Sequence, residues 1–206
     1  MTLISYIDAF LATFFLLIGV NYSTRIIGMR HRDHQPRIHY GNALSRAWFL
    51  RWTFNLFRLA ILLLLILRLP FPSIDSHLLW VFTLDNQDVV RWIGVILLTL
   101  SAGLISYVHS FMSSDWHSGI DRKIRIITTG PFKRSRHPLF QSIMLGMLGL
   151  ALALPSLFTL ICCITGITVL TLQAKLEEQK LIEHPDYQQY STQTPRWIWG
   201  RRLSTS

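Results

Sequence analysis

Two groups of polar side chains, each next to an apolar segment, contain residue types that could bind a charged small molecule. The first follows the turn that Gly130-Pro131 forces, and has Arg136 and His137 immediately before Pro138. Because proline suits the first turn of a helix, Arg136 and His137 are predicted at a helix N-terminus, where free backbone N–H groups can bind an anion. The alternative is a basic flank that only anchors the helix at a membrane interface.

The second group lies at the end of an apolar segment, where Glu177 and Glu178 are adjacent. Neighbouring residues of a helix point about 100° apart, so one carboxylate can face an inner pocket while the other is solvated. The alternative is a solvated helix end, in which Lys180, three residues further on, offsets the charge of Glu177.

The two groups are expected to meet in space. The apolar segments 139–154 and 157–174 are separated only by Pro155-Ser156, which predicts a tight helical hairpin rather than one long helix. The first segment then begins at the same end of the hairpin at which the second one finishes. A site for a soluble cofactor is therefore predicted at that end.

Composition places these segments in a membrane protein. The chain has 206 residues, of which 50% are hydrophobic and only 15% charged. A helix needs about 20 apolar residues to cross the hydrocarbon core of a bilayer. Five segments approach this length, and the predicted fold is all-α and integral to the membrane, with no strands and five transmembrane helices near 3–20, 53–70, 89–110, 139–154 and 157–174.

The basic residues predict the orientation of these helices. Seventeen of the twenty Lys and Arg lie in the loops 21–52 and 111–138 and in the tail from residue 175, whereas the connection 71–88 has none. Because short cytoplasmic loops retain positive charge, the N-terminus is predicted outside and the C-terminus in the cytoplasm, in a bacterial inner membrane. The net charge of +9 then reflects topology and contact with anionic lipid, rather than nucleic-acid binding.

Some residues are interpreted as structural. The fourth apolar segment has small residues at spacings that permit close helix packing, namely Ser142, Gly146, Gly149 and Ala153. Cys162 and Cys163 are adjacent and do not indicate a disulfide scaffold. No metal site is predicted, since the spacing of three neighbouring histidines matches no common ligand pattern: His31, His34 and His39.

Taken in order, the motifs resemble those of the isoprenylcysteine carboxyl methyltransferases and their relatives among the phospholipid methyltransferases. The resemblance covers about residues 90 to 199. It rests on Gly130-Pro-Phe-x-x-x-Arg136-His137-Pro138-x-Phe140, the helical hairpin, Glu177-Glu178-x-x-Leu181, Pro185-x-Tyr187-x-x-Tyr190 and Thr194-Pro195-Arg196, with Trp116-His117-Ser118-Gly119 and Ile127-Thr-Thr-Gly130 upstream. It divides the single membrane domain 1–206 into the first two spans with a variable region, 1–88, and a methyltransferase-like core, 89–199.

The resemblance implies an integral-membrane enzyme that transfers a methyl group from S-adenosylmethionine to a lipid-borne or hydrophobic acceptor. The chain has no Gly-rich turn after a strand, in agreement with a site that is not of the Rossmann type. By position in the motifs, the implied cofactor-binding residues are His117, Ile124, Arg125, Ile126, Ile127, Phe132, His137, Pro138, Leu139, Phe140 and Glu177.

Each part of the cofactor has a candidate partner among these residues. His137 or the backbone N–H groups near it can hold the carboxylate, Glu177 can accept from the ribose or the ammonium, and Phe132 and Phe140 can pack against adenine or the sulfonium. For the phenylalanines, the alternative is ordinary helix packing. No general base is assigned, because the sulfonium is already an activated donor.

Contacts to the acceptor are expected from Arg136, Gln173, Arg58 and Tyr187. Gln173 stands where the isoprenylcysteine enzymes have an Arg that engages a substrate carboxylate, so the acceptor need not be a prenylcysteine. Arg58 could replace that Arg by binding an acidic headgroup, or could extend to the interface. The alternative functions are a membrane sterol or enone reductase that uses NADPH, and a non-catalytic scaffold or transport component.

Overall fold

The computed structural model describes residues 3–33, 44–71, 73–75, 81–82, 86–112, 126–198 and 200. Their elements are the helices α1 (Leu3–Asp33), α2 (Arg46–Leu67), α3 (Gln87–Phe111), α4 (Pro138–Ala153), α5 (Leu157–Leu181) and α6 (Pro185–Gln193), and the short 3-10 helix η2 (Gly130–Lys133). In these residues an isolated bridge between Val81 and Ser156 is the only β pairing. The predicted all-α fold is confirmed.

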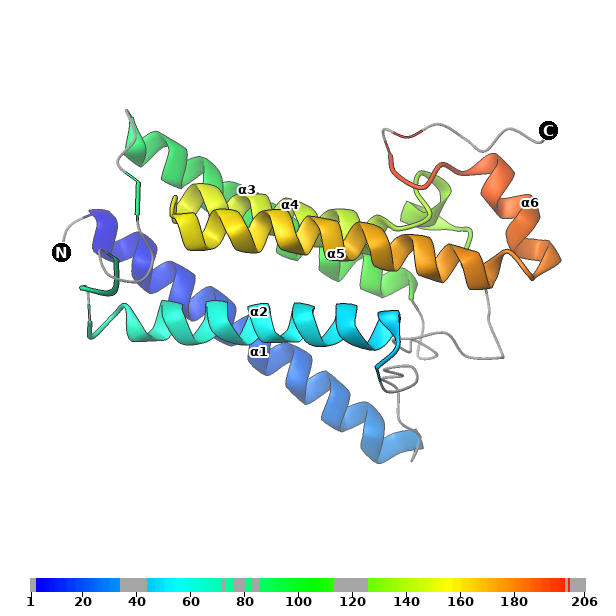
Figure 1. Cartoon of the computed structure of the whole chain (residues 1–206), viewed down its shortest axis with the longest axis horizontal. Coiled ribbons are helices and arrows are strands. Elements are labelled where there is room, and N and C mark those ends of the chain that lie inside the picture. Colours follow the sequence, from blue (N-terminus) through cyan, green and yellow to red (C-terminus); the bar gives the residue numbers. More distant parts are fainter. Residues whose placement is uncertain are drawn as a thin grey trace.

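The five long helices form an elongated bundle in which consecutive helices run in opposite directions (Figure 1). At one end lie the start of α1, the end of α2, the start of α3 and the α4–α5 connection. Their contacts include a hydrogen bond from the Arg91 side chain of α3 to the Ala153 carbonyl of α4. At the opposite end lie the start of α4, the end of α5 and the short helices η2 and α6 (Figure 1). This arrangement has the alternation that the sequence predicted.

A cluster of buried charged residues joins α1, α2 and α3 at the end of the bundle where α1 begins. Asp8 of α1 accepts hydrogen bonds from Arg68, just after α2, at 3.0 Å and from Arg91 of α3 at 2.9 Å. Arg68 also pairs with both carboxylate oxygens of Asp75. Since both guanidinium groups are almost fully buried, each needs these partners to offset its lost hydration. The cluster fixes α1 against the end of the bundle that lies furthest from the motifs.

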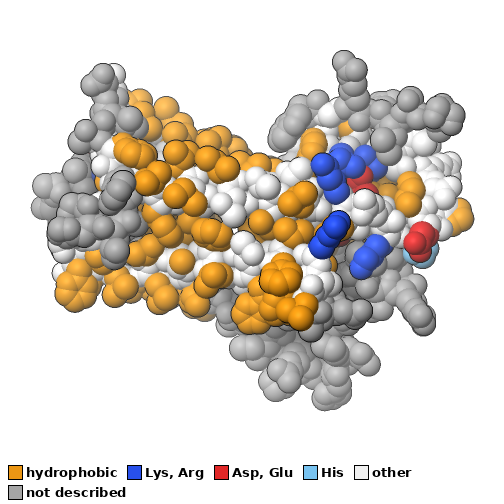
Figure 2. Space-filling view, in the orientation of Figure 1, with side chains coloured by type: hydrophobic (Ala, Val, Ile, Leu, Met, Phe, Trp, Pro, Cys, Tyr) orange, Lys and Arg blue, Asp and Glu red, His pale blue; other side chains and the backbone are white. Residues whose placement is uncertain are grey.

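The bundle surface is that of a membrane protein. Large apolar side chains are exposed along α2, α3 and α5, among them Leu56, Leu63, Ile96, Leu100 and Ile164. In Figure 2 hydrophobic side chains cover most of the visible bundle, and the described Lys and Arg gather near the end that carries α6. An apolar exterior of this extent is stable where lipid rather than water surrounds it.

Three of the described helices, α2, α3 and α5, are long and apolar enough to cross a membrane. The apolar stretches of α1 (Tyr6–Asn21) and of α4 (Pro138–Ala153) are shorter. At about 1.5 Å per residue, sixteen residues reach about 24 Å, less than the roughly 30 Å of a bilayer core. The structure therefore supports three spans, and five full spans stay a prediction.

Helices α3 and α4 pack closely because small residues line their contact. A Cβ added to Gly149 of α4 would lie 2.8 Å from the Leu98 amide nitrogen of α3, and one added to Gly146 would lie 2.6 Å from Oγ of Ser101. The Ser101 hydroxyl also donates to the Ser142 carbonyl at 2.7 Å. The predicted structural role of the small residues of the fourth segment is confirmed.

We expect Gly94→Ala to destabilise the protein. The added methyl group would press against the Ala153 backbone and lie 2.6 Å from the Gly149 carbonyl oxygen, so we expect the free energy of unfolding to fall by about 1 to 3 kcal/mol. Gly103 of the same helix is the matched control, because an added Cβ meets nothing within 4 Å there. Gly103→Ala should stabilise the helix by up to about 1 kcal/mol. Unfolding of both variants in one detergent measures the difference, and equal shifts would contradict this packing.

The connection between α4 and α5 is short and well capped. The Ser156 hydroxyl accepts from the Thr159 amide at 3.1 Å, while the Thr159 hydroxyl donates to the Leu154 carbonyl at 2.6 Å. Helix α5 then continues to Leu181, beyond the predicted end of the apolar segment at residue 174. This extension carries Glu177 and Glu178 to the start of α4.

Candidate active site

The segment before α4 adopts the turn that its sequence predicts. Gly130 has φ of +59°, and a Cβ at this position would collide with the ring of Phe111 at the end of α3, so only glycine fits. The chain then forms η2 and reaches His137, the N-cap of α4, with Pro138 as the first helical residue. The prediction of a helix start at Arg136-His137-Pro138 is confirmed.

The C-terminal motifs fold back onto this segment. The Tyr190 hydroxyl of α6 donates to the Phe132 carbonyl at 2.6 Å. The Arg136 amide donates to the Pro195 carbonyl at 3.0 Å, and the Ser135 hydroxyl donates to the Arg196 carbonyl at 2.8 Å. Burial raises the pKa of Tyr190 well above its usual value, so this phenol remains a donor at neutral pH. Motifs about 60 residues apart therefore form one unit.

Glu178 is the central acid of this unit. Its carboxylate accepts two hydrogen bonds from Arg196, at 3.0 and 2.6 Å, and one contact of 3.0 Å joins it to Nε2 of His137. Nη1 of Arg136 lies 3.5 Å from the same carboxylate. Hydrogen bonding to the Glu178 carboxylate raises the pKa of the Arg196 guanidinium above its usual value. Glu178 is only 7% exposed. The expectation that one glutamate of the pair is solvated is therefore wrong for Glu178.

Glu177 faces a different direction. A quarter of its side chain is exposed, and its Oε1 accepts from the Gln173 amide group at 3.1 Å. Its other oxygen lies 3.9 Å from Nδ1 of His137, so the imidazole lies between the two glutamates. Arg51, near the start of α2, also acts electrostatically on Glu177. This carboxylate retains capacity to accept further hydrogen bonds from a ligand.

Glu177 lines a cavity of about 140 Å³ at the start of α4, which we call the motif cavity. Its walls come from the residue that follows α3, from η2, from the start of α4, and from α5 and α6. The ring of Phe140 stacks on that of His137, with the ring centroids 5.3 Å apart. The lining residues are Met112, Phe132, Arg136, His137, Pro138, Leu139, Phe140, Glu177, Leu181 and Tyr187.

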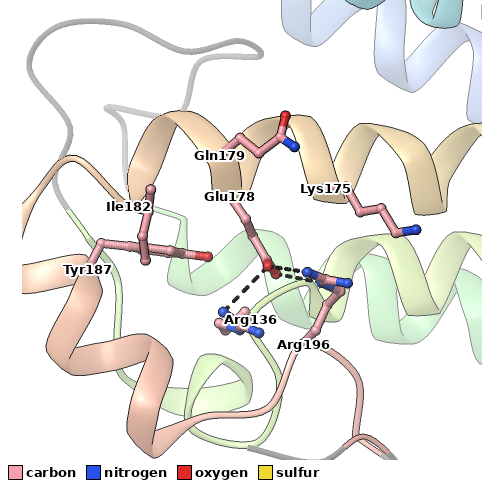
Figure 3. A pocket seen from close by; sticks show the side chains of 7 residues that line it. All are labelled: Arg136, Lys175, Glu178, Gln179, Ile182, Tyr187 and Arg196. Carbon is pink, nitrogen blue, oxygen red and sulfur yellow. Dashed lines mark hydrogen bonds and ion pairs between the residues drawn. The ribbon is translucent and has the colours of Figure 1, made fainter. Parts of the chain in front are cut away.

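A second cavity of about 310 Å³, which we call the basic cavity, lies beside Glu178 and is drawn in Figure 3. Its lining residues are Arg136, Lys175, Glu178, Gln179, Ile182, Tyr187 and Arg196. Arg136 and Tyr187 line both cavities. The Tyr187 hydroxyl and Nε of Arg136 are buried without a hydrogen-bond partner among the described residues. Nη1 of Arg136 makes no hydrogen bond among them either, but it forms the ion pair with Glu178.

The segment that builds these cavities is similar to a known protein family. Residues 89–188 match the family model of the phospholipid methyltransferases. The match confirms the resemblance that the motifs indicated, and it spans the chain from the start of α3 into α6. No curated protein and no solved structure matches the chain.

The segment that matches the family model brings together six of the eleven residues predicted to bind the cofactor. Phe132, His137, Pro138, Leu139, Phe140 and Glu177 all line the motif cavity. Ile126 and Ile127 precede η2 but do not line either cavity. His117, Ile124 and Arg125 lie outside the described residues, as do His34 and His39.

Of the four residues predicted to contact an acceptor, two line both cavities and two line neither. Arg136 and Tyr187 line both cavities, whereas Gln173 supports Glu177 from one helical turn away. Arg58 lies in the middle of α2 and lines neither cavity. The expectation that Arg58 replaces the missing Arg therefore has no support in the geometry.

Some residues of the site were not foreseen. Arg196 was noted only as part of a motif, and its two hydrogen bonds to Glu178 depend on the return of the chain through α6. Arg51 was counted only among the basic loop residues. Met112 and Leu181 complete the wall of the motif cavity. A signal for Arg196 was present, since a buried glutamate requires a cation and the tail supplies one.

Proposed function

We propose that this protein is a membrane methyltransferase that transfers the methyl group of S-adenosylmethionine to a lipid-borne or hydrophobic acceptor. The match to a methyltransferase family and the apolar helices support an integral-membrane enzyme of this class. The observation that carries the proposal is the motif cavity, where six residues of the family pattern meet within the matched segment.

The chemistry of the motif cavity fits parts of this cofactor. Glu177 can accept from the ammonium or the ribose hydroxyls, and the rings of Phe132 and Phe140 offer apolar faces to adenine or the sulfonium. His137 is less suited to the cofactor carboxylate than we expected, because both ring nitrogens face glutamates. The amides of Leu139 and Phe140, which have no acceptor within α4, suit that carboxylate better.

The size of the motif cavity sets a limit on this assignment. Complete pockets for drug-sized ligands measure roughly 300 to 1,000 Å³, and the motif cavity is smaller. It therefore accommodates part of the cofactor, with the basic cavity on the other side of Arg136 and Tyr187.

In this proposal the cofactor supplies an activated methyl group, and the protein positions it. Glu177 and the aromatic rings orient the donor, while the apolar walls of the motif cavity exclude water from it. The acceptor reaches the site from the bilayer along the helices. The basic loops predict that the site end of the bundle faces the cytoplasm, where they also contact anionic lipid.

Ligand-induced stabilisation of the full chain in detergent tests the function. We expect S-adenosylhomocysteine to raise the unfolding temperature and NADPH to leave it unchanged, because a ligand that binds only the folded protein stabilises it, by about 2.7 kcal/mol at 100 times its Kd. A shift with NADPH alone would indicate a reductase instead. No shift with either ligand would favour a non-catalytic scaffold or transport component.

A further inference from the structure

We propose that His137 takes up the proton that the acceptor releases on methyl transfer, and that Glu178 positions the imidazole ring for this step. The inference rests on the proposed function and adds a catalytic residue to it. It applies to an acceptor whose attacking nitrogen or oxygen carries a hydrogen. Such an atom becomes cationic once it is methylated, and a cation is poorly stabilised in an apolar cavity unless a base removes the proton.

The imidazole ring is held in one orientation. Nε2 of His137 lies 3.0 Å from Oε1 of Glu178, within hydrogen-bond range, whereas Nδ1 lies 3.9 Å from Oε2 of Glu177, which is too long for a hydrogen bond. The ring stacks on Phe140, and Trp197 packs against it with the ring centroids 5.9 Å apart. Nδ1 therefore lies on the side of Glu177, which lines the motif cavity together with His137.

The surroundings of Glu178 decide which ring nitrogen carries the proton. Glu178 accepts two hydrogen bonds from Arg196, and Nη1 of Arg136 forms an ion pair with it at 3.5 Å. An ionised carboxylate has no proton to donate, so the proton in its contact with His137 must be on Nε2. The two guanidinium groups beside Glu178 (Figure 3) oppose a second positive charge on the ring. Nδ1 then keeps its lone pair and can accept a proton.

Both glutamates stabilise the ring once it has accepted this proton. Glu178 stays hydrogen-bonded to Nε2, and Oε2 of Glu177 faces the protonated Nδ1. Among the described residues, the charged groups around the ring are these two glutamates, Arg136 and Arg196. A carboxylate that orients an imidazole and then stabilises the imidazolium is the arrangement that general-base histidines use in other enzymes.

One methyl group and one proton are transferred in this step. S-adenosylmethionine, when bound, supplies a methyl group on a positively charged sulfur. The attacking atom of the acceptor forms a bond to the methyl carbon while the sulfur–methyl bond breaks, and the electron pair of the broken bond stays on the sulfur. The proton of the attacking atom passes to Nδ1 of His137, which returns it to water after the products leave.

The resting tautomer of His137 is the first test, and it needs neither cofactor nor acceptor. Nuclear magnetic resonance of the full chain in detergent, with isotopically labelled histidine nitrogens, reports which ring nitrogen carries a proton. The signals of His137 are those that His137→Gln removes. At neutral pH we expect an uncharged ring with its proton on Nε2. A proton on Nδ1, in an uncharged or a charged ring, would overturn the inference.

Methyl transfer into lipid by His137→Gln is the second test. The glutamine amide can still donate to Glu178, but no base remains in the place of Nδ1. We expect this variant to bind S-adenosylhomocysteine within about three-fold of the native affinity. At saturating S-adenosylmethionine, its rate of methyl transfer should be at least about 100-fold lower, as is typical for the loss of a general base.

His184→Gln is the matched control. Like His137, His184 is the N-cap of a helix that begins with proline, and its side chain makes no capping hydrogen bond. It lines neither cavity, so the variant should bind and transfer as the native protein does. A His137→Gln protein that transfers as fast as the native one, or whose cofactor affinity falls as far as its rate, would overturn the inference alone. A native protein that neither binds S-adenosylhomocysteine nor transfers a methyl group would instead overturn the proposed function.

Discussion

Replacing Glu178 with Ala will lower the free energy of unfolding by about 3 to 5 kcal/mol, the cost of removing one partner from a buried ion pair. The carboxylate is the shared partner of Arg136, His137 and Arg196, which come from the start of α4 and from the tail. Without it, the Arg136 cation is left buried at 2% exposure. The tail should then detach from the segment before α4, and heat or denaturant unfolding in detergent will show the loss.

Glu183→Ala provides the matched control, since this glutamate is exposed just after α5. Its removal should change stability by less than about 1 kcal/mol. In a double-mutant cycle with Arg196→Ala, the loss in the double variant should fall short of the sum of the single losses, because both remove the same pair. A Glu178→Ala protein as stable as the Glu183→Ala protein would contradict the central role of Glu178.

Glu177→Gln will have the opposite effect to Glu178→Ala: it will weaken cofactor binding and leave stability almost unchanged. We expect affinity for S-adenosylhomocysteine to fall about 10- to 100-fold, because a hydrogen bond to a charged group is worth about 1.5 to 3 kcal/mol. Stability should change little, because the side chain is a quarter exposed and the amide can still bond to Gln173. Calorimetric titration of the native and variant proteins measures the affinity.

The control for this prediction is Glu183→Gln, which removes the same charge from an exposed position outside both cavities. It should bind S-adenosylhomocysteine as the native protein does. Weaker binding in both variants to the same degree would indicate a general effect of charge, and would remove Glu177 from the cofactor site. The two glutamates thus separate folding from binding, although they are adjacent in the chain.

Local sequence rules predicted much of the site. Gly130 can adopt the positive φ that the turn requires, and Pro131 and Pro138 each have a fixed φ, so the turn and the helix start could be placed without knowing the rest of the fold. The short link at Pro155-Ser156 then forces the start of α4 and the end of α5 to the same end of the bundle. These constraints bring His137 and Glu177 together.

The roles of the two glutamates could not be predicted in the same way. Helix geometry shows that Glu177 and Glu178 point in different directions, but not which neighbour each one meets. That depends on α6, which returns the chain so that Arg196 reaches Glu178. Contacts between segments so distant in sequence leave no local pattern, and a buried role for Glu178 was therefore missed.

Helix length was the other weak point of the sequence interpretation. Apolar runs show where a helix is hydrophobic but not where it ends, and α5 continues seven residues beyond the predicted segment end at residue 174. The reverse holds for α4, whose sixteen residues are apolar but short for a full span. Its small residues pack it against α3, which gives this short helix a protein partner.

Transfer of radiolabelled methyl groups from S-adenosylmethionine into lipid tests the central claim most directly. The purified full chain is placed in vesicles of total lipid extract from the cells that produce it. The lipid is then extracted into an organic phase, and the radioactivity of that phase is measured. We predict label in a lipid fraction with the native protein and with Glu183→Gln, and its loss with Glu177→Gln. A native protein that binds S-adenosylhomocysteine but labels no lipid, or a Glu177→Gln protein that labels lipid as fast, would contradict the account.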